Sequence, residues 1–328
     1  MPRIGMNPAR GKKSAYQPAR VTVAVLTYLP HLAGYFQNRL EVTRVCLQSI
    51  LTNTSTPYDL IVFDNGSCTE AVEMLKQMRL AGQIDFLLLS AQNIGKMGAL
   101  KMIFSSAPGE VVAYSDDDVF FLPGWLDRHL EVMDTYPDVG VVTGMYIKPH
   151  MKEGVNSVLR FCEREDVYVE KGNLVDRELE QHYIEQTGRT WERYLEEIHG
   201  LQDIRLTYKG VQTFASAGHY QMTVRKEVML KALPDDWSGN LMGQMRDLDV
   251  AIDELGFLRL CTTPPTIRLL GNQIDEKSAS LIRQYDVDVR AVSGIKSASG
   301  WKKKLSRHPL VQKVAYFFYE RLFKIINA

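Results

Sequence analysis

Apolar strand-like runs and helix-like segments alternate along the first third of this chain, and this alternation constrains its fold more than any other feature. Four runs are rich in β-branched or other apolar residues, as is typical of strands buried on both faces: VTVAVLTYL (21–29), YDLIVF (58–63), IDFLLL (84–89) and EVVAYS (110–115). Helices are predicted between them, at 39–54, 69–80 and 97–106. The pattern predicts an α/β fold whose mostly parallel sheet is flanked by helices on both faces.

The remaining sequence divides into an insertion, a return to strands and helices, and a tail. The charge-rich residues 150–212 predict an insertion, with a helix near 189–201. Further on, we expect a strand and a helix within 211–233, a helix at 246–257 and a strand at 258–270 that Pro264-Pro265 interrupts. We therefore predict three parts: a flexible leader (1–20), an α/β domain (21–272) and a C-terminal helical tail (273–328).

Composition limits the classes of partner and the compartment. The 328 residues include 39 Lys plus Arg and 39 Asp plus Glu, so no global basic field for nucleic acid exists. The four cysteines lack metal-site spacing, which favours reduced thiols in a cytoplasmic protein. The polar N-terminus has no apolar segment typical of a secretory signal, and no run is long enough for a membrane span.

Polar residues follow the predicted strands at the point where each strand ends. They are Thr27 and Tyr28, the turn Asp64 to Ser67, Asn93, and the triplet Asp116 to Asp118. Ligands of open α/β sheets bind at the carboxyl ends of the strands. We therefore expect these side chains to converge on one binding site.

The acidic triplet has two interpretations. Three adjacent carboxylates repel one another, and a hard cation such as Mg²⁺ or Mn²⁺ relieves this repulsion while leaving positions for phosphate oxygens. The alternative is a solvated acidic loop that caps the next helix. The Asp64-Asn65-Gly66-Ser67 segment is similarly open to two interpretations: a base or ribose contact, or a tight turn.

The order of the motifs carries a resemblance that no single motif carries. A strand ending in Thr-Tyr is followed by DNGS, NIGKMGAL, SDDDVFFLPGWL, SAGHYQMTVRKEV and RDLDVAIDELGF. In this order the chain resembles glycosyltransferase family 2 over residues 21–272. The resemblance implies the GT-A fold, which is Rossmann-like, and a nucleotide-diphospho-sugar donor.

The resemblance also implies the donor-binding residues. Thr27 and Tyr28 stand where the first strand meets the nucleotide, and Asp64 and Asn65 stand at the base or ribose. The loop near the diphosphate corresponds to Asn93, Gly95 and Lys96. Asp116 and Asp118 correspond to the DXD pair that holds the metal ion and the donor, with Asp117 as a substitute.

For the acceptor side, the resemblance implies a further set of residues. Ser216 to His219 line the acceptor side of the sugar, with His219 a secondary catalytic candidate, and Asp247 stands at the catalytic base. Asp249 is the second acidic candidate beside it. The alternatives are charges that complement a helix dipole for Asp247 and Asp249, and a partly buried structural histidine for His219.

Two positions depart from the family pattern. Arg246 replaces the Glu of the usual Glu-Asp pair, and Leu269 stands at a late position where a metal-ligating His is common. Arg268 or the loop after Gly271-Asn272 is the alternative contact for the diphosphate. These departures leave open whether the metal ion is essential.

The sequence therefore predicts a transferase that is metal-dependent and inverting, with Mn²⁺ or Mg²⁺ as the cation. It would move a sugar from a UDP-sugar, or else a GDP-sugar, to a hydroxyl acceptor in polysaccharide or glycolipid assembly. The alternatives are a catalytically impaired nucleotide-sugar-binding protein and a nucleotidyltransferase. The second ranks lower because no glycine-rich, Arg-containing phosphate loop follows the first strand.

The tail, residues 301–328, predicts an amphipathic helix preceded by basic residues. Its apolar positions fit a homodimer seam or packing on the chain's own core. Its basic and aromatic residues also fit peripheral contact with the inner face of the membrane.

Overall fold

The computed structural model describes residues 7, 9–236, 239–287 and 321. The chain forms two compact units, residues 1–288 and 289–328. All the elements below belong to the first unit, and residue 321 is the described part of the second. The predicted tail helix at 301–328 thus lies outside the described residues, apart from residue 321, and its dimer and membrane roles stay predictions.

The described strands are β1 (Val21–Thr27), β2 (Tyr58–Asp64), β3 (Phe86–Leu89), β4 (Val111–Asp116), β5 (Val119–Phe121), β6 (Val139–Thr143), β7 (Val167–Gly172), β8 (Asp203–Tyr208), β9 (Val211–Ala215), β10 (Gln221–Arg225), β11 (Leu258–Thr262) and β12 (Ile267–Leu269). The α-helices are α1 (Arg39–Asn53), α2 (Thr69–Leu80), α3 (Gly95–Ser106), α4 (Trp125–Thr135), α5 (Asn156–Phe161), α6 (Arg177–Thr187), α7 (Trp191–Glu197), α8 (Lys226–Ala232), α9 (Met245–Glu254) and α10 (Glu276–Gln284). Two short 3₁₀ helices are η1 (Gly34–Phe36) and η2 (Lys148–Lys152).

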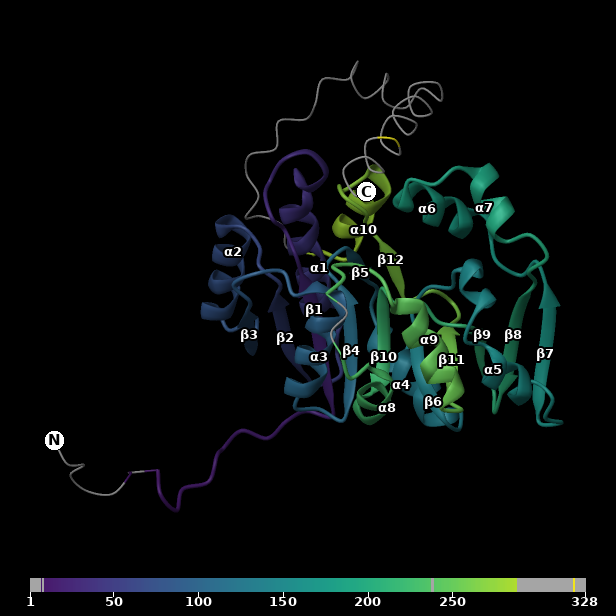
Figure 1. Cartoon of the computed structure of the whole chain (residues 1–328), viewed down its shortest axis with the longest axis horizontal. Coiled ribbons are helices and arrows are strands. Elements are labelled where there is room, and N and C mark those ends of the chain that lie inside the picture. Colours follow the sequence, from purple (N-terminus) through teal and green to yellow (C-terminus); the bar gives the residue numbers. More distant parts are fainter. Residues whose placement is uncertain (1–6, 8, 237–238, 288–320, 322–328) are drawn as a thin grey trace. The chain divides into compact units, whose positions relative to one another are not determined.

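One large sheet organises the unit, with the order β3-β2-β1-β4-β10-β6-β11-β9-β8-β7 (Figure 1). Strands β3, β2, β1 and β4 are parallel, and β6 is also parallel to them because β10 is antiparallel to both β4 and β6. β11 and β8 share this direction, so seven of the ten described strands of the sheet point the same way. The predicted mostly parallel α/β sheet is confirmed, and β12 and β5 form a separate antiparallel pair.

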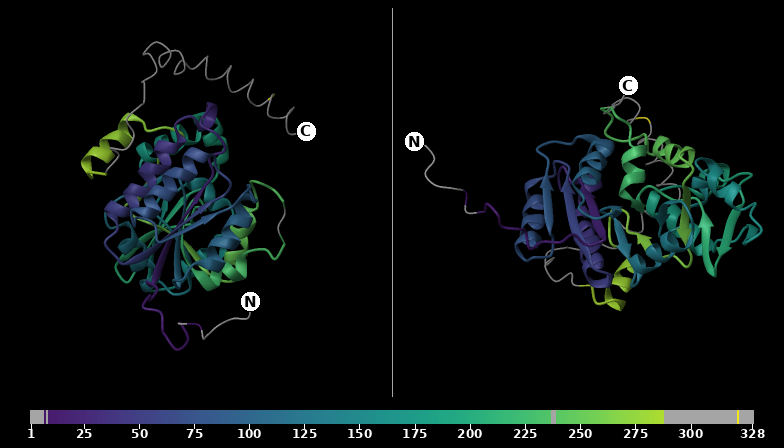
Figure 2. Two further views of the ribbon diagram at one scale, coloured as in Figure 1. Left: turned by 90° about the vertical axis from the view of Figure 1, so that its left-hand side faces the viewer. Right: turned by 90° about the horizontal axis from the view of Figure 1, so that it is seen from below.

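Helices cover both faces of the sheet (Figure 2) because the central strands are apolar on both sides. Val21, Val23 and Val25 of β1 belong to a core that includes residues of α1, α2 and α4. Ala24 and Leu26 belong to a second core, with residues of α3, α8 and α9. All seven residues of β1 are buried, as its run of β-branched residues predicts.

The strand registers bring the predicted polar strand ends to one edge. Thr27 pairs with Asp64 across β1 and β2, and Leu26 pairs with Asp116 across β1 and β4. Asp64 also pairs with Leu89, the last residue of β3. The carboxyl ends of these strands therefore lie side by side.

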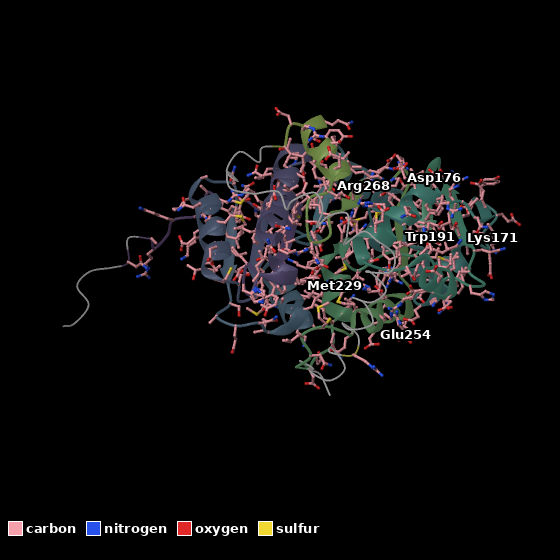
Figure 3. All side chains as sticks on the ribbon, turned by 90° about the horizontal axis from the view of Figure 1, so that it is seen from above. Lys171, Asp176, Trp191, Met229, Glu254 and Arg268 are labelled. Carbon is pink, nitrogen blue, oxygen red and sulfur yellow. The ribbon has the colours of Figure 1, made fainter. Side chains whose placement is uncertain are left out.

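Residues 150–212 join the main sheet: β7 pairs with β8, and β8 pairs with β9. Lys171, Asp176 and Trp191 of this segment lie at the same end of the molecule (Figure 3). The helix expected near 189–201 is shorter, since α7 ends at Glu197. The segment therefore extends the fold rather than forming a separate unit.

Two local expectations differ from the structure. The region 211–225 contains two strands, β9 and β10, where one was expected. The interrupted strand at 258–270 divides into β11 and β12, which belong to different sheets. Because proline has no amide hydrogen, Pro264-Pro265 cannot continue the hydrogen-bonded ladder. None of the helices in the described ranges combines the length and apolar character that a membrane span requires.

Candidate active site

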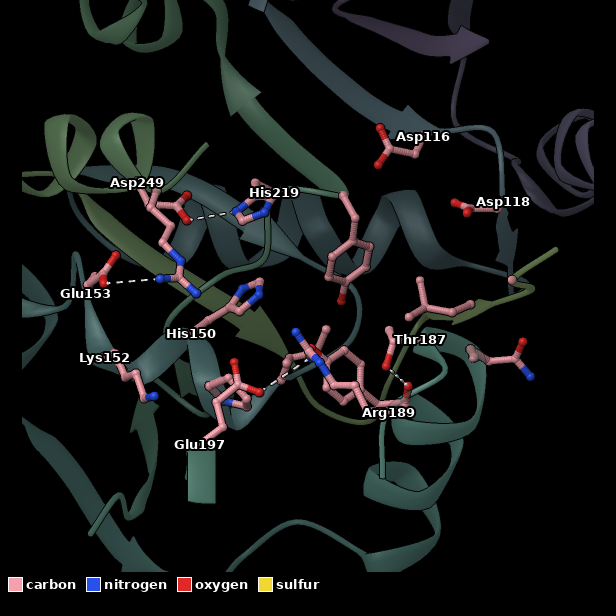
Figure 4. A pocket seen from close by; sticks show the side chains of 18 residues that line it. Asp116, Asp118, His150, Lys152, Glu153, Thr187, Arg189, Glu197, His219 and Asp249 are labelled. Atoms are coloured by element: carbon pink, nitrogen blue, oxygen red, sulfur yellow. Dashed lines mark hydrogen bonds and ion pairs between the residues drawn. The ribbon is translucent and has the colours of Figure 1, made fainter. Parts of the chain in front are cut away.

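A cavity of about 310 Å³ opens at the carboxyl end of β4 (Figure 4). One end is lined by Asp116 and Asp118, and the other includes His219 and Asp249. Segments far apart in the sequence meet here: the β4 end, η2, the α6–α7 region, the loop before β10, and α9. A volume of this size lies within the range typical of small-molecule sites.

At the acidic end, a buried arginine bridges two of the carboxylates. Arg39, the first residue of α1, donates to Asp117 and, through Nη1, to Oδ2 of Asp118 at 2.8 Å. Asp117 also accepts from the Thr43 hydroxyl at 2.7 Å. Burial raises the pKa of Asp117 to about 6, although Arg39 and Thr43 oppose this shift. Asp117 is thus a structural partner of Arg39 rather than a group that faces the cavity.

Asp116 is held by two donors. Lys96 Nζ lies 2.7 Å from its Oδ2, and the Tyr114 hydroxyl donates to its Oδ1 at 2.6 Å. Lys96 is the second residue of α3, so this contact connects the third helix to the triplet. Lys96 therefore lies beside the first carboxylate of the triplet, and its expected place near the diphosphate stays a prediction.

The triplet offers limited room for a divalent cation. Among the described residues, no group of three or more His, Cys, Asp or Glu side chains forms a ready-made metal site. Within the same part of the chain, Oδ1 of Asp118 has no hydrogen-bond partner, and Asp118 lines the cavity. Mg²⁺ is commonly bound by one or two carboxylates together with water and substrate phosphates. Asp118, with Asp116 beside it, fits that kind of site.

Both carboxylate oxygens of Asp64 accept hydrogen bonds around the turn that follows β2. Its Oδ1 accepts from the Thr27 hydroxyl at 3.2 Å, and its Oδ2 accepts from the backbone N–H of Ser67 at 3.1 Å. Both Asp64 and Asn65 are buried. The tight-turn interpretation therefore accounts for these contacts, and a base or ribose contact stays a prediction.

Asn65 connects this turn to the loop before α3. It donates to Asn93 Oδ1 at 3.0 Å and accepts from the N–H of Ile94 at 2.9 Å. Asn93 in turn accepts from the N–H of Gly95 at 2.8 Å. Gly95 has φ +75°, and a Cβ there would lie 2.5 Å from the carbonyl oxygen of Asn240. These residues build the loop that positions Lys96.

The other predicted nucleotide contacts lie beside the cavity rather than in its wall. Thr27 is buried at the end of β1, and the half-buried Tyr28 contacts Phe36 edge-on at 6.2 Å. Neither residue belongs to the cavity lining, nor do Asp64, Asn65, Asn93, Gly95 and Lys96. Their predicted nucleotide contacts are therefore not tested by the cavity.

At the other end, a second buried arginine holds a carboxylate. Arg259 of β11 donates to Asp249 Oδ1 at 2.8 Å and to the carbonyls of Gly154 and Ala217 at 2.9 and 2.5 Å. Its side chain is only 1% exposed. Oδ2 of Asp249 accepts from Nδ1 of His219 at 3.0 Å. Both Asp249 and His219 line the cavity.

His150 of η2 stacks on His219, with ring centroids 5.2 Å apart and planes 13° from parallel. Burial, with a smaller contribution from His219, lowers the pKa of His150 to about 3. His150 therefore stays neutral, and it supports the His219 ring without adding a charge.

Asp247 lies outside the cavity. It is exposed in the first turn of α9, and it does not belong to the cavity lining. The neighbouring Arg246 does line the cavity, and its side chain is 69% exposed and 3.8 Å from Glu153. The geometry therefore brings together Asp249 and His219, whereas a catalytic role for Asp247 stays a prediction.

The end of β12 and the turn that follows it contribute to the cavity wall. Leu269 and Gly271 line the cavity, and the carbonyl of Gly271 accepts from Arg39 at 3.1 Å. Arg268 does not line it. The insertion supplies a wall of the cavity, through Tyr183, Thr187, Arg189 and Glu197.

Sequence reasoning missed Arg39, Arg259 and His150. A charged residue inside the apolar run LRLCT is a signal that could have indicated Arg259, because a buried arginine requires a carboxylate partner. No comparable pattern in the sequence marks Arg39 or His150.

The fold is a mostly parallel α/β sheet with carboxylates at the carboxyl end of β4. Residues 36–197 match the model of glycosyl transferase family 2. The predicted resemblance to glycosyltransferase family 2 is therefore confirmed over this range.

The individual relatives are distant. An uncharacterized glycosyltransferase of Nostoc sp. is 30% identical over 96 residues, which is 29% of this chain and 30% of that protein. The match thus spans less than a third of the curated relative.

Two solved structures are similar at low identity. A mannosyltransferase from Pyrobaculum calidifontis, in complex with GDP-Man and Mn²⁺, is 17% identical; the match covers 76% of this chain and 56% of that one, with a TM-score of 0.44. GalNAc-T7 with UDP, GalNAc and Mn²⁺ is 11% identical; the match covers 82% of this chain and 49% of that one, with a TM-score of 0.46.

Proposed function

We propose that this chain transfers a sugar from a nucleotide-diphospho-sugar to a hydroxyl acceptor. The observation that carries the proposal is a single cavity with Asp116 and Asp118 at one end and His219 with Asp249 at the other. A donor diphosphate needs positive charge or a metal ion, and an acceptor hydroxyl needs a base. The family match covers the acidic end and part of the insertion.

The proposed reaction is a single displacement at the anomeric carbon. The acceptor oxygen forms a bond to that carbon while the bond from the carbon to the diphosphate oxygen breaks. The nucleoside diphosphate leaves with the electron pair, and a base of the protein takes the acceptor proton. Attack opposite the leaving group inverts the configuration.

On the donor side, Lys96 and Asp118 would have different roles: the first would neutralise charge and the second would bind a cation. Lys96 is a cation beside Asp116, and it would neutralise charge on the leaving diphosphate. Asp118, with Asp116, would hold a divalent cation, Mn²⁺ or Mg²⁺, which supplies further charge neutralisation when bound. UDP is favoured as the nucleotide and GDP is the alternative, on family frequency alone.

On the acceptor side, the insertion would select the substrate. Arg189 lies over the ring of the buried Tyr183, and Thr187, Arg189 and Glu197 offer polar contacts along the same wall. Arg189 lies 3.7 Å from Glu197, so this wall presents a paired rather than a free charge. We propose a neutral glycan or glycolipid hydroxyl as the acceptor class.

The test is the release of nucleoside diphosphate by the full chain. UDP- and GDP-sugars would each be incubated with the protein, with Mn²⁺ or with a chelator, and with and without a panel of sugar acceptors. We expect release of one nucleoside diphosphate that an acceptor stimulates and that Asp118→Asn lowers. Failure of the folded protein to bind any nucleotide in calorimetry would contradict the proposal.

The second candidate is a nucleotide-sugar-binding protein that has lost the chemistry. It is favoured by the exposure of Asp247 and by the apolar Leu269 in the cavity wall. Tight nucleotide binding without release or transfer from any sugar conjugate would select this candidate. Transfer of the nucleotide moiety instead would indicate a nucleotidyltransferase.

The cellular setting is part of the proposal. A cytoplasmic protein at the inner face of the membrane, or a homodimer joined by the C-terminal helix, fits the composition of residues 301–328. Sedimentation of the full chain, alone and with anionic vesicles, distinguishes these arrangements.

A further inference from the structure

We infer that His219, oriented by Asp249, is the group that takes the proton from the acceptor hydroxyl. This inference rests on the proposed function and deepens it, since it assigns the base to an imidazole nitrogen rather than to a carboxylate of α9. The hydrogen bonds of the cluster determine which of its oxygens and nitrogens can still accept a proton.

Asp249 has both carboxylate oxygens engaged. Oδ1 pairs with the buried Arg259 at 2.8 Å, and Oδ2 accepts from His219 at 3.0 Å. Its side chain is 12% exposed. A carboxylate whose two oxygens already accept hydrogen bonds from fixed donors is held in one orientation and has little capacity left for a third donor. Asp249 is therefore a positioning residue.

His219 has the opposite character. A carboxylate can only accept a hydrogen bond, so the 3.0 Å contact places the proton on Nδ1 of His219. The neutral ring then carries its lone pair on Nε2, which has no hydrogen-bond partner in the described part of the chain. The side chain is 25% exposed and lines the cavity (Figure 4). A neutral imidazole in this tautomer is a competent general base.

The neighbouring charges favour this role. As Nε2 takes a proton, the ring becomes positive beside Asp249, which stabilises it; Arg259 opposes this effect from behind Asp249. His150, stacked on the ring, stays neutral because burial and His219 keep its pKa near 3. The other charged groups that line this end of the cavity are Lys152 and the pair Arg246 and Glu153, which lie 3.8 Å apart.

The experiment is the pH profile of transfer by the full chain, with His219→Asn as the main variant. Asparagine retains an amide donor toward Asp249 and removes the basic nitrogen. We expect kcat to fall by about 100-fold or more while the Kd for the nucleoside diphosphate changes little. The loss of rate at acidic pH, which a histidine base produces in the wild type, should disappear from the residual activity of the variant.

Three controls keep the inference falsifiable. His199→Asn makes the same substitution at an exposed histidine outside the cavity lining and tests for nonspecific effects. Imidazole added to His219→Ala should restore part of the rate, which a purely structural role would not allow. In Asp247→Asn, the acidic limb of the wild-type profile should persist.

The outcomes separate this inference from the proposed function. A wild type that transfers sugar, together with a His219→Asn variant that retains its rate and acidic limb, overturns the assignment of His219. Loss of the acidic limb in Asp247→Asn also overturns it, because the base would then be Asp247. A wild type that binds nucleotide but transfers no sugar contradicts the proposed function instead.

Discussion

At each end of the cavity a buried arginine pairs with a carboxylate, but the two ends leave different groups available. At the acidic end, Arg39 pairs with Asp117 and Asp118, and one oxygen of Asp118 has no partner in the described part of the chain. At the other end, Arg259 and His219 engage both oxygens of Asp249, and an imidazole nitrogen is available instead. One end therefore presents a carboxylate oxygen to the cavity, and the other presents an imidazole nitrogen.

The hydrogen bonds that a buried arginine makes can therefore determine what a neighbouring carboxylate is able to bind. A carboxylate with an available oxygen can bind a cation, whereas a fully engaged carboxylate can orient a histidine. In both places the arginine compensates a charge that would be costly to bury alone. The following changes should affect the two ends differently.

The largest effect is expected from Arg259→Met. This change leaves Asp249 without its cationic partner and removes donors from the carbonyls of Gly154 and Ala217. Breaking a buried pair typically costs about 3–5 kcal/mol of the free energy of unfolding. Urea denaturation measures this loss.

A double variant sharpens this result. Replacing Asp249 by Asn in the Arg259→Met background removes the uncompensated charge, so part of the lost stability should return. A double variant no more stable than the single one would show that packing of the Arg259 stem, rather than the ion pair, controls this end.

The next largest effect is on donor binding. Asp118→Asn weakens the proposed cation site and should lower metal-dependent affinity for the nucleoside diphosphate about 10- to 100-fold, since interactions of charged groups contribute about 1.5–3 kcal/mol. Calorimetry with Mn²⁺ and with a chelator measures it. His219→Asn is the matched comparison, and an equal loss of donor affinity in that variant would abolish the distinction between the two ends.

A third prediction concerns His129, a buried histidine that does not line the cavity. His129 is fully buried in α4, and its ring nitrogens contact the hydroxyls of Thr223 at 2.8 Å and Thr266 at 3.0 Å. Burial lowers its pKa to about 3. Because the unfolded state binds the proton more readily, this histidine's contribution to stability is present above about pH 6.5 and lost as pH falls toward 3.

The measurement is the free energy of unfolding at pH 7 and pH 5. His129 should account for a loss of about 2 kcal/mol between these pH values. His129→Gln, although less stable overall, should show a smaller difference between them. An unchanged pH dependence in this variant would mean that other groups cause the acid sensitivity.

Much of the parallel half of the fold could be predicted from local patterns. α2 begins at Thr69 and ends at Leu80, as its periodicity and the preceding turn indicate. The acidic triplet was located because it follows a strand that is apolar along its length. Patterns of this kind involve residues that are close in the sequence, so they can be recognised without knowing the structure.

The rest depends on contacts between distant segments. Arg39 and Asp117 are 78 residues apart, and nothing near Arg39 indicates which carboxylates it meets. The strands of the insertion were missed because β7 is mostly exposed or half-buried and lacks an apolar run. Which of Asp247 and Asp249 lines the cavity likewise depends on the orientation of α9, since both belong to the same Arg-Asp-Leu-Asp motif.

The smallest effect is expected from Arg246→Gln, at the position where the family usually has an acid. Its pairing with Glu153, at 3.8 Å with both side chains well exposed, resembles a surface ion pair, which contributes about 0–1 kcal/mol. Urea denaturation should therefore show a change below about 0.5 kcal/mol. A loss near that of Arg259→Met would mean that Arg246 is part of the buried network. A small change would instead separate this arginine from the two that hold the carboxylates, and would show that burial, more than charge, decides which cations organise the cavity.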